Sequence, residues 1–275
     1  MDRLLFGTAG SPITSRVRTR AAGLDRLVEL GLDGMELEFV RGVRMAEDPL
    51  AVREQAQRLG LVLTAHGPYY INLFSKDPAK TSASVERVLA TARTAHACGA
   101  FSCTFHAAFY QGRPADKVYA AVRDRLKGIV RVLQDEGNPI WVRPETTGKP
   151  SQFAGLEELL SLSAEIEQVR PTIDWSHLHA RSGGKFNTSE EFRTVLTRVE
   201  DVLGKDGLQD MHMHVAGIEY TDKGERRHLD LAESDLRWSE LLSVLKEFNV
   251  TGMLICESPS IEGDALVLRD AYRAL

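Results

Sequence analysis

Apolar and β-branched residues are concentrated in eight short runs along the chain, and longer stretches with a different spacing separate them. Runs of roughly four to eight such residues are typical of buried strands. The runs comprise residues 4–8, 35–39, 61–66, 101–106, 139–145, 172–174, 209–215 and 251–257. We therefore predict eight strands.

Between these runs, apolar residues recur every three or four positions, which is the period of an amphipathic helix. This spacing is found in Val85, Val88, Leu89 and Ala92; in Val118, Val122, Leu126 and Val130; in Leu156, Leu159 and Leu160; in Leu241, Leu242 and Leu245; and in the end helix 265–275. Strands that alternate with helices predict an α/β fold with a parallel sheet, and eight such units predict a (β/α)8 TIM barrel. The longest segment predicted to be irregular is 216–237, and long loops are usually functional.

The length and composition fit one TIM-barrel domain that covers residues 1–275. The chain has 275 residues, of which 43% are hydrophobic, and a typical barrel has about 250 residues. The formal net charge is -5 and the pI is about 5.9. An overall basic field, the usual sign of nucleic-acid binding, is therefore excluded, whereas a local basic groove is not.

The sequence also predicts a cytoplasmic protein without a membrane partner. No apolar run approaches the roughly 20 residues of a membrane span, and the N-terminal MDRLLFGTAGSP lacks the long apolar segment of a signal peptide. Cys98, Cys103 and Cys256 form no CxxC motif and are odd in number. We interpret them as reduced thiols.

Histidine or carboxylate side chains end six consecutive predicted strands. They are His66, His106, Glu145, Asp174 with His177, His212 with His214, and Glu257. Because the C-terminal strand ends of a barrel converge on one rim, where active sites are built, we expect these side chains to meet. His228 lies in the long loop above that rim. Of the two histidines on strand seven, His212 is deeper and is favoured over His214.

Imidazole and carboxylate groups without thiolates suit Zn²⁺, and also Mn²⁺ or Fe²⁺. One ion takes roughly four protein ligands, so the surplus predicts more than one ion. Glu145 could bridge two ions about 3.5–4 Å apart, a spacing suited to phosphoryl chemistry. The alternative is a set of rim histidines bonded to backbone carbonyls. We expect His179 to point away, since Asp174 and His177 already supply an Asp-x-x-His spacing.

Six motifs follow one another along nearly the whole chain: HGPYYINL, FHAAF, PETTGK, DWSH, MHMHVAG and ICESP. Each is weak alone, but the ordered set resembles endonuclease IV, the zinc-dependent apurinic/apyrimidinic endonucleases of base-excision repair. The resemblance implies a TIM barrel with three zinc ions. By position it implies one zinc on His66, His106 and Glu145; a second on Glu145, Asp174, His212 and Glu257; and a third on His177 and His228.

The resemblance also implies hydrolysis of the phosphodiester 5′ to an abasic deoxyribose in double-stranded DNA, with Glu145 and Glu257 as catalytic residues. Tyr69 and Tyr70 would enter the minor groove and fill the space of the displaced nucleotide. The alternative for both tyrosines is packing over the barrel rim or stacking on a sugar. Arg41 would contact phosphates, although a solvated loop arginine is equally consistent with the sequence.

The chain departs from the endonuclease IV pattern at the third zinc. The family has an Asp two positions before the loop histidine, where this chain has Arg226 in GERRHLDL. Glu225 is a candidate replacement if the loop shifts; otherwise Arg226 would weaken or exclude this ion and leave two. His214, a further candidate ligand, and Val215 stand where the family has an amide and an acid.

Two other classes of function stay open. A sugar isomerase or epimerase of the xylose isomerase-like barrels would use one divalent metal and two acid/base groups. Glu145 and Glu257 could serve, and Glu36 and Glu38 are further candidates. The surplus of ligands favours the nuclease, because one metal cannot use them all. A metal-binding, non-catalytic binder of DNA or sugar is the third class, and intact ligands without turnover would support it.

Overall fold

The computed structural model describes residues 1–17 and 19–275, and the chain divides into two compact units. Unit 1 comprises Met1–Met35, Gly148–Pro150 and Ile173–Leu275. Unit 2 comprises Glu36–Thr147 and Ser151–Thr172. Two strands cross the division, namely β2 (Gly34–Glu38) and β6 (Thr172–Asp174).

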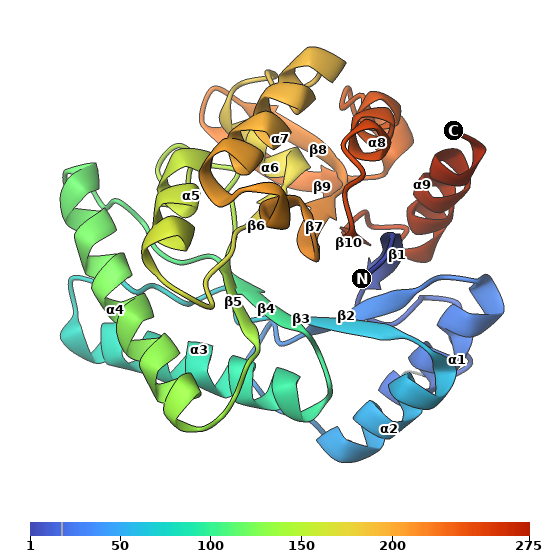
Figure 1. The fold of residues 1–275 in the computed structure, drawn as a ribbon, viewed down its shortest axis with the longest axis horizontal. Helices are drawn as coiled ribbons and strands as arrows, with labels where there is room; N and C mark the ends of the chain where they lie inside the picture. The colour runs from blue at the N-terminus through green and yellow to red at the C-terminus, as the bar shows by residue number, and fades with distance from the viewer. Residues whose placement is uncertain (18) are drawn as a thin grey trace. The chain divides into compact units, whose positions relative to one another are not determined.

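Unit 1 is built from the first strand and the C-terminal half of the chain (Figure 1). Its other elements are β1 (Leu4–Ala9), α1 (Arg20–Leu30), α6 (Trp175–Arg181), α7 (Ser189–Leu203), η1 (Lys205–Leu208), β7 (Met211–Val215), β8 (Gly217–Thr221), β9 (Gly224–Leu229), η2 (Leu231–Glu233), α8 (Trp238–Glu247), β10 (Gly252–Cys256) and α9 (Glu262–Ala274). Strand β10 pairs in parallel with β1 on one side and with β7 on the other. Helix α9 packs against β1, β10 and α8.

Unit 2 also alternates strands with helices along the chain. Its elements are α2 (Pro49–Leu59), β3 (Val62–His66), α3 (Pro78–Ala97), β4 (Ser102–Phe105), α4 (Ala115–Asp135), β5 (Trp141–Pro144) and α5 (Leu156–Glu165). Strand β4 pairs in parallel with β3 and with β5. Helix α3 packs against α4 and against β3 and β4. The C-terminal ends of β3, β4 and β5 therefore point the same way, which gathers the residues that follow them.

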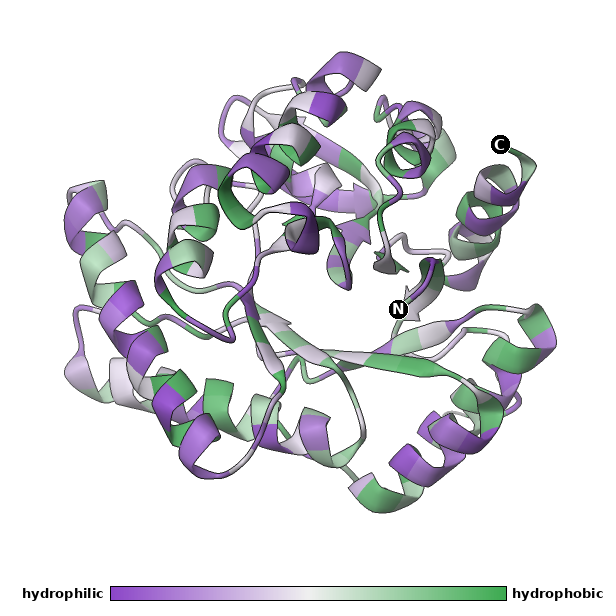
Figure 2. Ribbon diagram, viewed as in Figure 1, coloured by the Kyte–Doolittle hydropathy of each residue, from purple (hydrophilic) through white to green (hydrophobic). Residues whose placement is uncertain are grey.

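All eight predicted strands are present, with ends within two residues of those expected. The apolar spacing also predicted the helices correctly. Helix α4 buries Val118, Val122 and Leu126 on one face, and Figure 2 shows hydrophobic and hydrophilic residues alternating along it. Helix α7 begins with a capping box, in which Thr188 accepts the backbone N–H of Glu191 and the Glu191 carboxylate accepts that of Thr188.

The prediction of an irregular segment at 216–237 is wrong, because it contains the antiparallel hairpin β8–β9. The hairpin turns at Asp222 and Lys223, and Gly224 follows with a positive φ of 89°. An added Cβ at Gly224 would lie 2.2 Å from the carbonyl oxygen of Gly148, so this position requires glycine. The hairpin therefore lies directly against Gly148 in unit 1.

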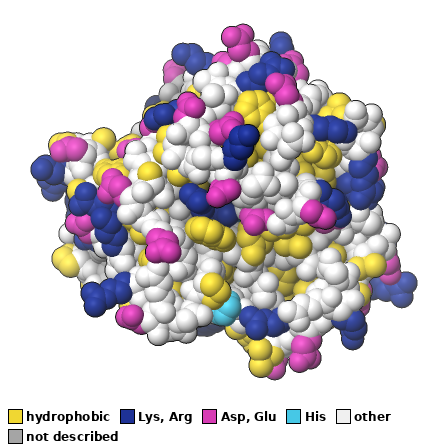
Figure 3. All heavy atoms as spheres, in the orientation of Figure 1, with side chains coloured by type: hydrophobic (Ala, Val, Ile, Leu, Met, Phe, Trp, Pro, Cys, Tyr) yellow, Lys and Arg dark blue, Asp and Glu magenta, His cyan; other side chains and the backbone are white. Residues whose placement is uncertain are grey.

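Among residues 1–17 and 19–275, no helix has both the length and the apolar content that a membrane crossing requires. The face shown in Figure 3 carries basic and acidic side chains interspersed with one another. This mixture agrees with the formal net charge of -5 and with the expectation that no overall basic field exists.

Candidate metal sites

In unit 2, the ends of β3, β4 and β5 bring His66, His106 and Glu145 together, as the sequence predicts. The Nε2 atom of His66 lies 3.1 Å from Glu145 Oε2, and the Nε2 atom of His106 lies 3.4 Å from Glu145 Oε1. One potential ligand atom from each residue lies within 4.8 Å of the other two. Both oxygens of a single carboxylate therefore face imidazole nitrogens, and we call these three residues the first cluster.

The other ring nitrogen of His66 fixes the orientation of its ring. Its Nδ1–H donates to the Gly67 carbonyl oxygen at 2.6 Å, which directs Nε2 toward Glu145. Gly67 has little room for a side chain, since an added Cβ would lie 3.1 Å from Ile71 Cδ1 and 3.2 Å from Thr91 Oγ1. The His-Gly pair of HGPYYINL thus positions the imidazole through close backbone packing.

Burial lowers the pKa of His66, but its partners outweigh that effect. The hydrogen bond to Glu145 and the charges of Glu145, Glu38 and Glu36 raise the pKa from 6.5 to about 10. Glu36 is fully buried in the same unit, and its carboxylate accepts a hydrogen bond from Thr64 Oγ1 at 3.0 Å. This concentration of carboxylates favours a positive charge, which either a proton or a metal cation would supply.

In unit 1, the Asp-x-x-His spacing is explained by a helix cap. Asp174 ends β6 and caps α6, and its Oδ1 accepts the backbone N–H of His177 at 2.7 Å. The other carboxylate oxygen lies 3.1 Å from His177 Nδ1. A residue at the third helical position necessarily lies beside the capping side chain. Asp174 and His177 are therefore brought together by a single turn of chain.

His228, on β9, completes this second cluster with Asp174 and His177. Its Nδ1–H donates to the carbonyl oxygen of Glu257 at 3.2 Å. Its Nε2 is buried and has no hydrogen-bond partner among the described residues. Nε2 faces a space that also receives ligand atoms of Asp174 and His177, and these atoms lie within 4.8 Å of one another.

A β-bulge in the hairpin decides which residue before His228 points inward. The pairing runs Ile218 with His228 and Glu219 with Arg227, but then shifts so that Tyr220 faces Glu225 and Arg226 is skipped. Arg226 and Arg227 both lie on the exposed side and bind the Glu219 carboxylate at 2.7 and 2.6 Å. Bulges re-aim side chains in this way.

Glu225 consequently points toward His177. Its Oε2 lies 3.6 Å from His177 Nε2. Gly148 makes room for this approach, since an added Cβ there would lie 2.7 Å from Glu225 Cβ and 3.0 Å from His177 Cδ2. The guanidinium of Arg226 therefore points away from the second cluster, whereas the carboxylate of Glu225 points toward it.

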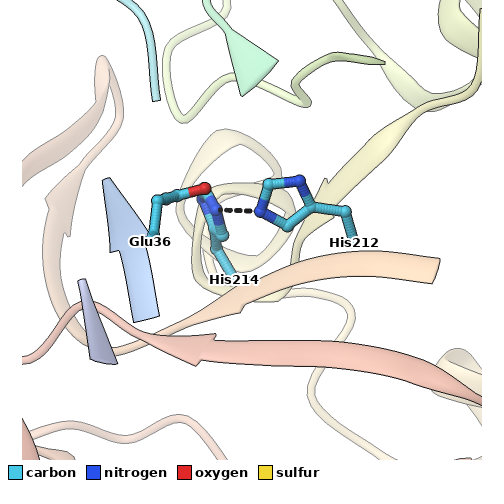
Figure 4. A group of neighbouring side chains, drawn as sticks. All are labelled: Glu36, His212 and His214. Atoms are coloured by element: carbon cyan, nitrogen blue, oxygen red, sulfur yellow. Dashed lines mark hydrogen bonds between the residues drawn. The ribbon is translucent and has the colours of Figure 1, made fainter. Parts of the chain in front are cut away.

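The two histidines of β7 are both fully buried and share one face of the strand. Figure 4 shows their rings with the Nε2 atoms facing each other, at a distance of 3.2 Å. His214 also approaches Glu257, with 3.4 Å between its Nδ1 and Glu257 Oε1. The preference for His212 over His214 as a ligand stays a prediction, but the contact with Glu257 belongs to His214.

His179 belongs to neither cluster, in agreement with the expectation that it points away. Its Nδ1–H donates to the Lys185 carbonyl at 2.9 Å, and its Nε2 lies 3.0 Å from Asp235 Oδ1. The hydroxyl of Tyr220 donates to the other oxygen of Asp235 at 2.7 Å. These contacts tie α6 to the hairpin β8–β9 and give His179 a structural role.

The expected DNA-contacting residues lie in unit 2 and are exposed. Tyr69 and Tyr70 follow His66 and have exposed fractions of 53% and 50%, which is unusual for aromatic side chains. The Tyr69 ring lies 5.4 Å from that of His66, and the guanidinium of Arg87 lies 4.6 Å above the Tyr70 ring. Arg41 is also exposed.

Cys98, Cys103 and Cys256 are buried thiols that form no disulfide with one another. Burial raises the pKa of Cys103 to about 12, and it also raises that of Cys256 to about 12. Thiols in this state are poor nucleophiles at neutral pH. The cysteines therefore match the predicted reduced state and offer no reactive thiolate.

Both clusters fit a divalent cation. In the first cluster, His66 donates a ring N–H to the carbonyl oxygen of Gly67. In the second, His228 donates a ring N–H to the carbonyl oxygen of Glu257. In both rings the other nitrogen then faces the cluster. Metal-binding histidines are held in this way. The donors are imidazole nitrogens and carboxylate oxygens without sulfur, a set that suits Zn²⁺ or Mn²⁺.

Comparison with known proteins gives one family match. The family model described as "Xylose isomerase-like TIM barrel" matches residues 24–275 of this chain. A Methanocaldococcus jannaschii protein named "Uncharacterized protein MJ0133" is 40% identical over 99% of this chain and 98% of its own. A "Probable endonuclease 4" of Mycoplasma pneumoniae is 24% identical over 72% of this chain and 68% of its own.

Two solved structures have nearly the same similarity to this chain. Endonuclease IV from Thermus thermophilus has a TM-score of 0.74 and 18% identity, covering 99% of this chain and 98% of its own. A D-tagatose 3-epimerase-like protein has a TM-score of 0.73 and 18% identity, and the match covers 98% of this chain and 96% of that protein's chain. At this level of identity the likeness extends to the fold alone.

Proposed function

Since the chain belongs to the xylose isomerase-like TIM barrel family, we propose that it is a zinc-dependent phosphodiesterase that cleaves DNA 5′ to abasic sites. Family membership confirms the predicted α/β TIM barrel with eight parallel strands. Together with the buried His, Asp and Glu clusters, it makes the chain a metal-dependent enzyme of this family. The choice of substrate is the proposal.

The observation that carries the proposal is that each unit contributes its own cluster of potential ligands. His66, His106 and Glu145 form the first, and Asp174, His177 and His228 form the second. One ion takes roughly four protein ligands, so six donors in two clusters support at least two ions. Multiple ions suit phosphodiester hydrolysis, in which a hydroxide attacks phosphorus and charge builds on the phosphate oxygens and on the departing 3′ oxygen.

When bound, divalent cations would supply Lewis acidity that stabilises negative charge on the phosphate oxygens. The chain's own residues would hold those cations and orient the attacking water. We assign Glu145 and Glu257 as the catalytic carboxylates. Glu145 faces two imidazoles of the first cluster, and Glu257 lies between His214 and His228. The buried cysteines, with pKa values near 12 for Cys103 and Cys256, agree with attack by water rather than by a thiolate.

We further propose Glu225 as a ligand of the second cluster in place of the missing acid at Arg226. The bulge between β8 and β9 and the glycine at position 148 both favour this role. For DNA binding, we propose Tyr69 and Tyr70 as the side chains that enter the minor groove and Arg41 as a phosphate contact. Their exposure on unit 2 supports this role.

The decisive experiment is cleavage of a duplex oligonucleotide with one abasic-site analogue. Zinc-loaded protein should cut once, 5′ to the lesion. The Glu257→Ala variant should lose at least about a hundredfold in rate, since it removes a carboxylate from the metal centre. Glu54→Ala, which changes an exposed glutamate on α2, is the matched control and should cut normally.

Two outcomes would contradict the proposal. Equal rates for Glu257→Ala and the parent protein would remove Glu257 from the site. Absence of a cut with zinc demonstrably bound would exclude the abasic-site reaction. Folding of each variant is checked by its circular dichroism spectrum, so that loss of activity is separated from loss of structure.

A ketose isomerase or epimerase is the second candidate. Glu36 and Glu145 are buried carboxylates of the same unit, and Glu36 is held by Thr64. Carbon–hydrogen proton transfer needs such acid/base groups next to the metal. Incubation with ketohexoses in deuterated water tests this candidate, because isomerisation or epimerisation would place deuterium on a sugar carbon.

A further inference from the structure

The imidazoles of His212 and His214 are in contact through the same atom of each ring, Nε2. Both Nε2 atoms face each other at 3.2 Å, and the ring planes are 77° apart. Two bare lone pairs would repel at this distance, so one Nε2 must carry a proton and the other must accept it, unless both bind the same ion. The question is which of the two rings faces the metal.

Glu257 distinguishes the two rings. His214 pairs in register with Ile255 on β10, and Glu257 lies two residues further on. As a result, His214 Nδ1 lies 3.4 Å from Glu257 Oε1. Two ligand atoms with bonds of roughly 2.0–2.2 Å and tetrahedral angles lie about 3.3–3.6 Å apart. His214 Nδ1 and Glu257 Oε1 are therefore spaced as two ligands of one ion.

This spacing fixes the protons of both rings. If Nδ1 of His214 binds an ion, that nitrogen carries no proton, and the neutral ring holds its proton on Nε2. The Nε2–H of His214 then donates to Nε2 of His212. His212 in turn must carry its own proton on Nδ1. The two rings are thus joined by a hydrogen bond in which His214, the ring that faces the ion, donates to His212, the ring deeper in the strand.

We propose that His214, not His212, is the metal ligand of β7, and that His212 is a positioning residue that holds the tautomer and ring orientation of His214. The inference rests on the proposed metal centre but not on the identity of the substrate. Loss of the residue that hydrogen-bonds to the second nitrogen of a metal-binding histidine typically weakens metal binding by about 10- to 100-fold.

Burial makes the arrangement specific. Both side chains are fully buried, so the contact between their Nε2 atoms is shielded from bulk water. Met211 and Met213 occupy the alternate positions of the strand and are buried as well. A short apolar residue at position 212 would remove the imidazole nitrogen that faces Nε2 of His214.

The test uses ¹¹³Cd²⁺ as a probe bound to wild-type protein labelled with ¹⁵N-histidine. Cadmium couples directly to the nitrogens that ligate it. We expect a coupling on Nδ1 of His214, none on either nitrogen of His212, and ¹⁵N shifts that report a protonated Nδ1 on His212. A coupling on His212 would overturn the proposal. Couplings on the Nε2 atoms of both rings would overturn it equally, since they would mean a shared ion.

Two variants give a readout that does not depend on activity. Titration against a chromophoric chelator should show one fewer zinc ion for His214→Leu. His212→Leu should keep the number of ions but bind one of them about 10- to 100-fold more weakly. His212→Gln retains an acceptor and should restore most of that affinity, whereas equal loss in His212→Leu and His212→Gln would contradict a positioning role. Absence of coupling on every histidine would instead reject the metal centre itself.

Discussion

At the scale of single residues, His66 links the metal-free and metal-bound forms of the protein. Its ring donates to Gly67 and faces Glu145, and these contacts raise its pKa from 6.5 to about 10. Because the folded-state pKa is raised, the protonated ring stabilises the metal-free fold fully below about pH 6.5. That contribution is lost as the pH rises through about 10.

A metal must displace this proton, because only a neutral imidazole is a ligand. We therefore expect zinc binding to the first cluster near pH 8 to release about one proton from His66, and the apparent affinity to rise with pH until the pH passes about 10. Calorimetric titrations in two buffers with different ionisation enthalpies measure the released protons. Identical heats in both buffers would contradict the expectation.

Among the residues proposed to bind the metal, most could be predicted from the sequence because parallel strands end together. His66, His106 and Glu145 follow three adjacent strands of unit 2, so the strand prediction alone brings them to one edge. The contact of His214 with Glu257 could not be predicted. It depends on the register between β7 and β10, which a strand pattern without turn constraints does not specify.

At the scale of elements, Asp174 has two roles that one substitution can separate. It caps α6 through Oδ1 and contributes to the second cluster. Asn caps helices as well as Asp does but is a weaker metal ligand. We expect Asp174→Asn to change the unfolding free energy of the metal-free protein by less than about 0.5 kcal/mol and to weaken zinc binding, whereas Asp174→Ala should also lose about 1 kcal/mol.

Urea unfolding in the presence of a chelator measures the unfolding free energy of the metal-free protein. Competition with a chromophoric chelator measures the zinc affinity. If Asp174→Asn bound zinc as tightly as the parent protein, the carboxylate would be a cap only. The two readouts are independent, so a loss of stability cannot be mistaken for a loss of metal.

The hairpin β8–β9 shows what the sequence pattern does not contain. Its second strand, GERRHL, carries charged residues on both faces and so lacks the apolar alternation that predicts a strand. The turn at Asp222–Lys223–Gly224 was the available signal for it. The direction of Glu225 toward His177 depends on the bulge and on the room left by Gly148, a tertiary contact that the strand pattern does not contain.

The bulge makes a testable prediction about charge placement. Glu225→Gln should weaken metal binding at the second cluster by about tenfold or more, whereas Arg226→Ala should have no effect, since Arg226 is 61% exposed and turned away. Deletion of Arg226 should also preserve binding, because it removes the bulged residue and leaves Glu225 opposite Tyr220. Zinc affinity measured by chelator competition compares the three variants, and a larger loss for the deletion than for Glu225→Gln would contradict the assignment.

At the scale of the whole molecule, bound metal should contribute to stability independently of any activity. A ligand that binds only the folded state adds about 4 kcal/mol at a free concentration of roughly 1,000 times its dissociation constant. For a chain of this length, that corresponds to a rise in Tm of roughly 10 °C. We expect chelation to lower the Tm by this amount and added zinc to restore it.

Differential scanning calorimetry with and without chelator measures this shift. A variant with His66→Ala and His177→Ala, one ligand from each cluster, should show a much smaller shift. If the parent protein melted at the same temperature in both conditions, neither cluster would bind a metal with useful affinity.

The buried cysteines have a practical consequence for measuring these equilibria. Cys98, Cys103 and Cys256 are all inaccessible in the folded chain, and the thiols of Cys103 and Cys256 ionise only near pH 12. The native protein is thus already a silent background for thiol-directed dyes. A single cysteine introduced at an exposed position such as Glu54 could be labelled selectively without first removing the natural thiols. Fluorescence from that one dye would then follow binding of DNA, sugar or metal in a chain whose core is unaltered.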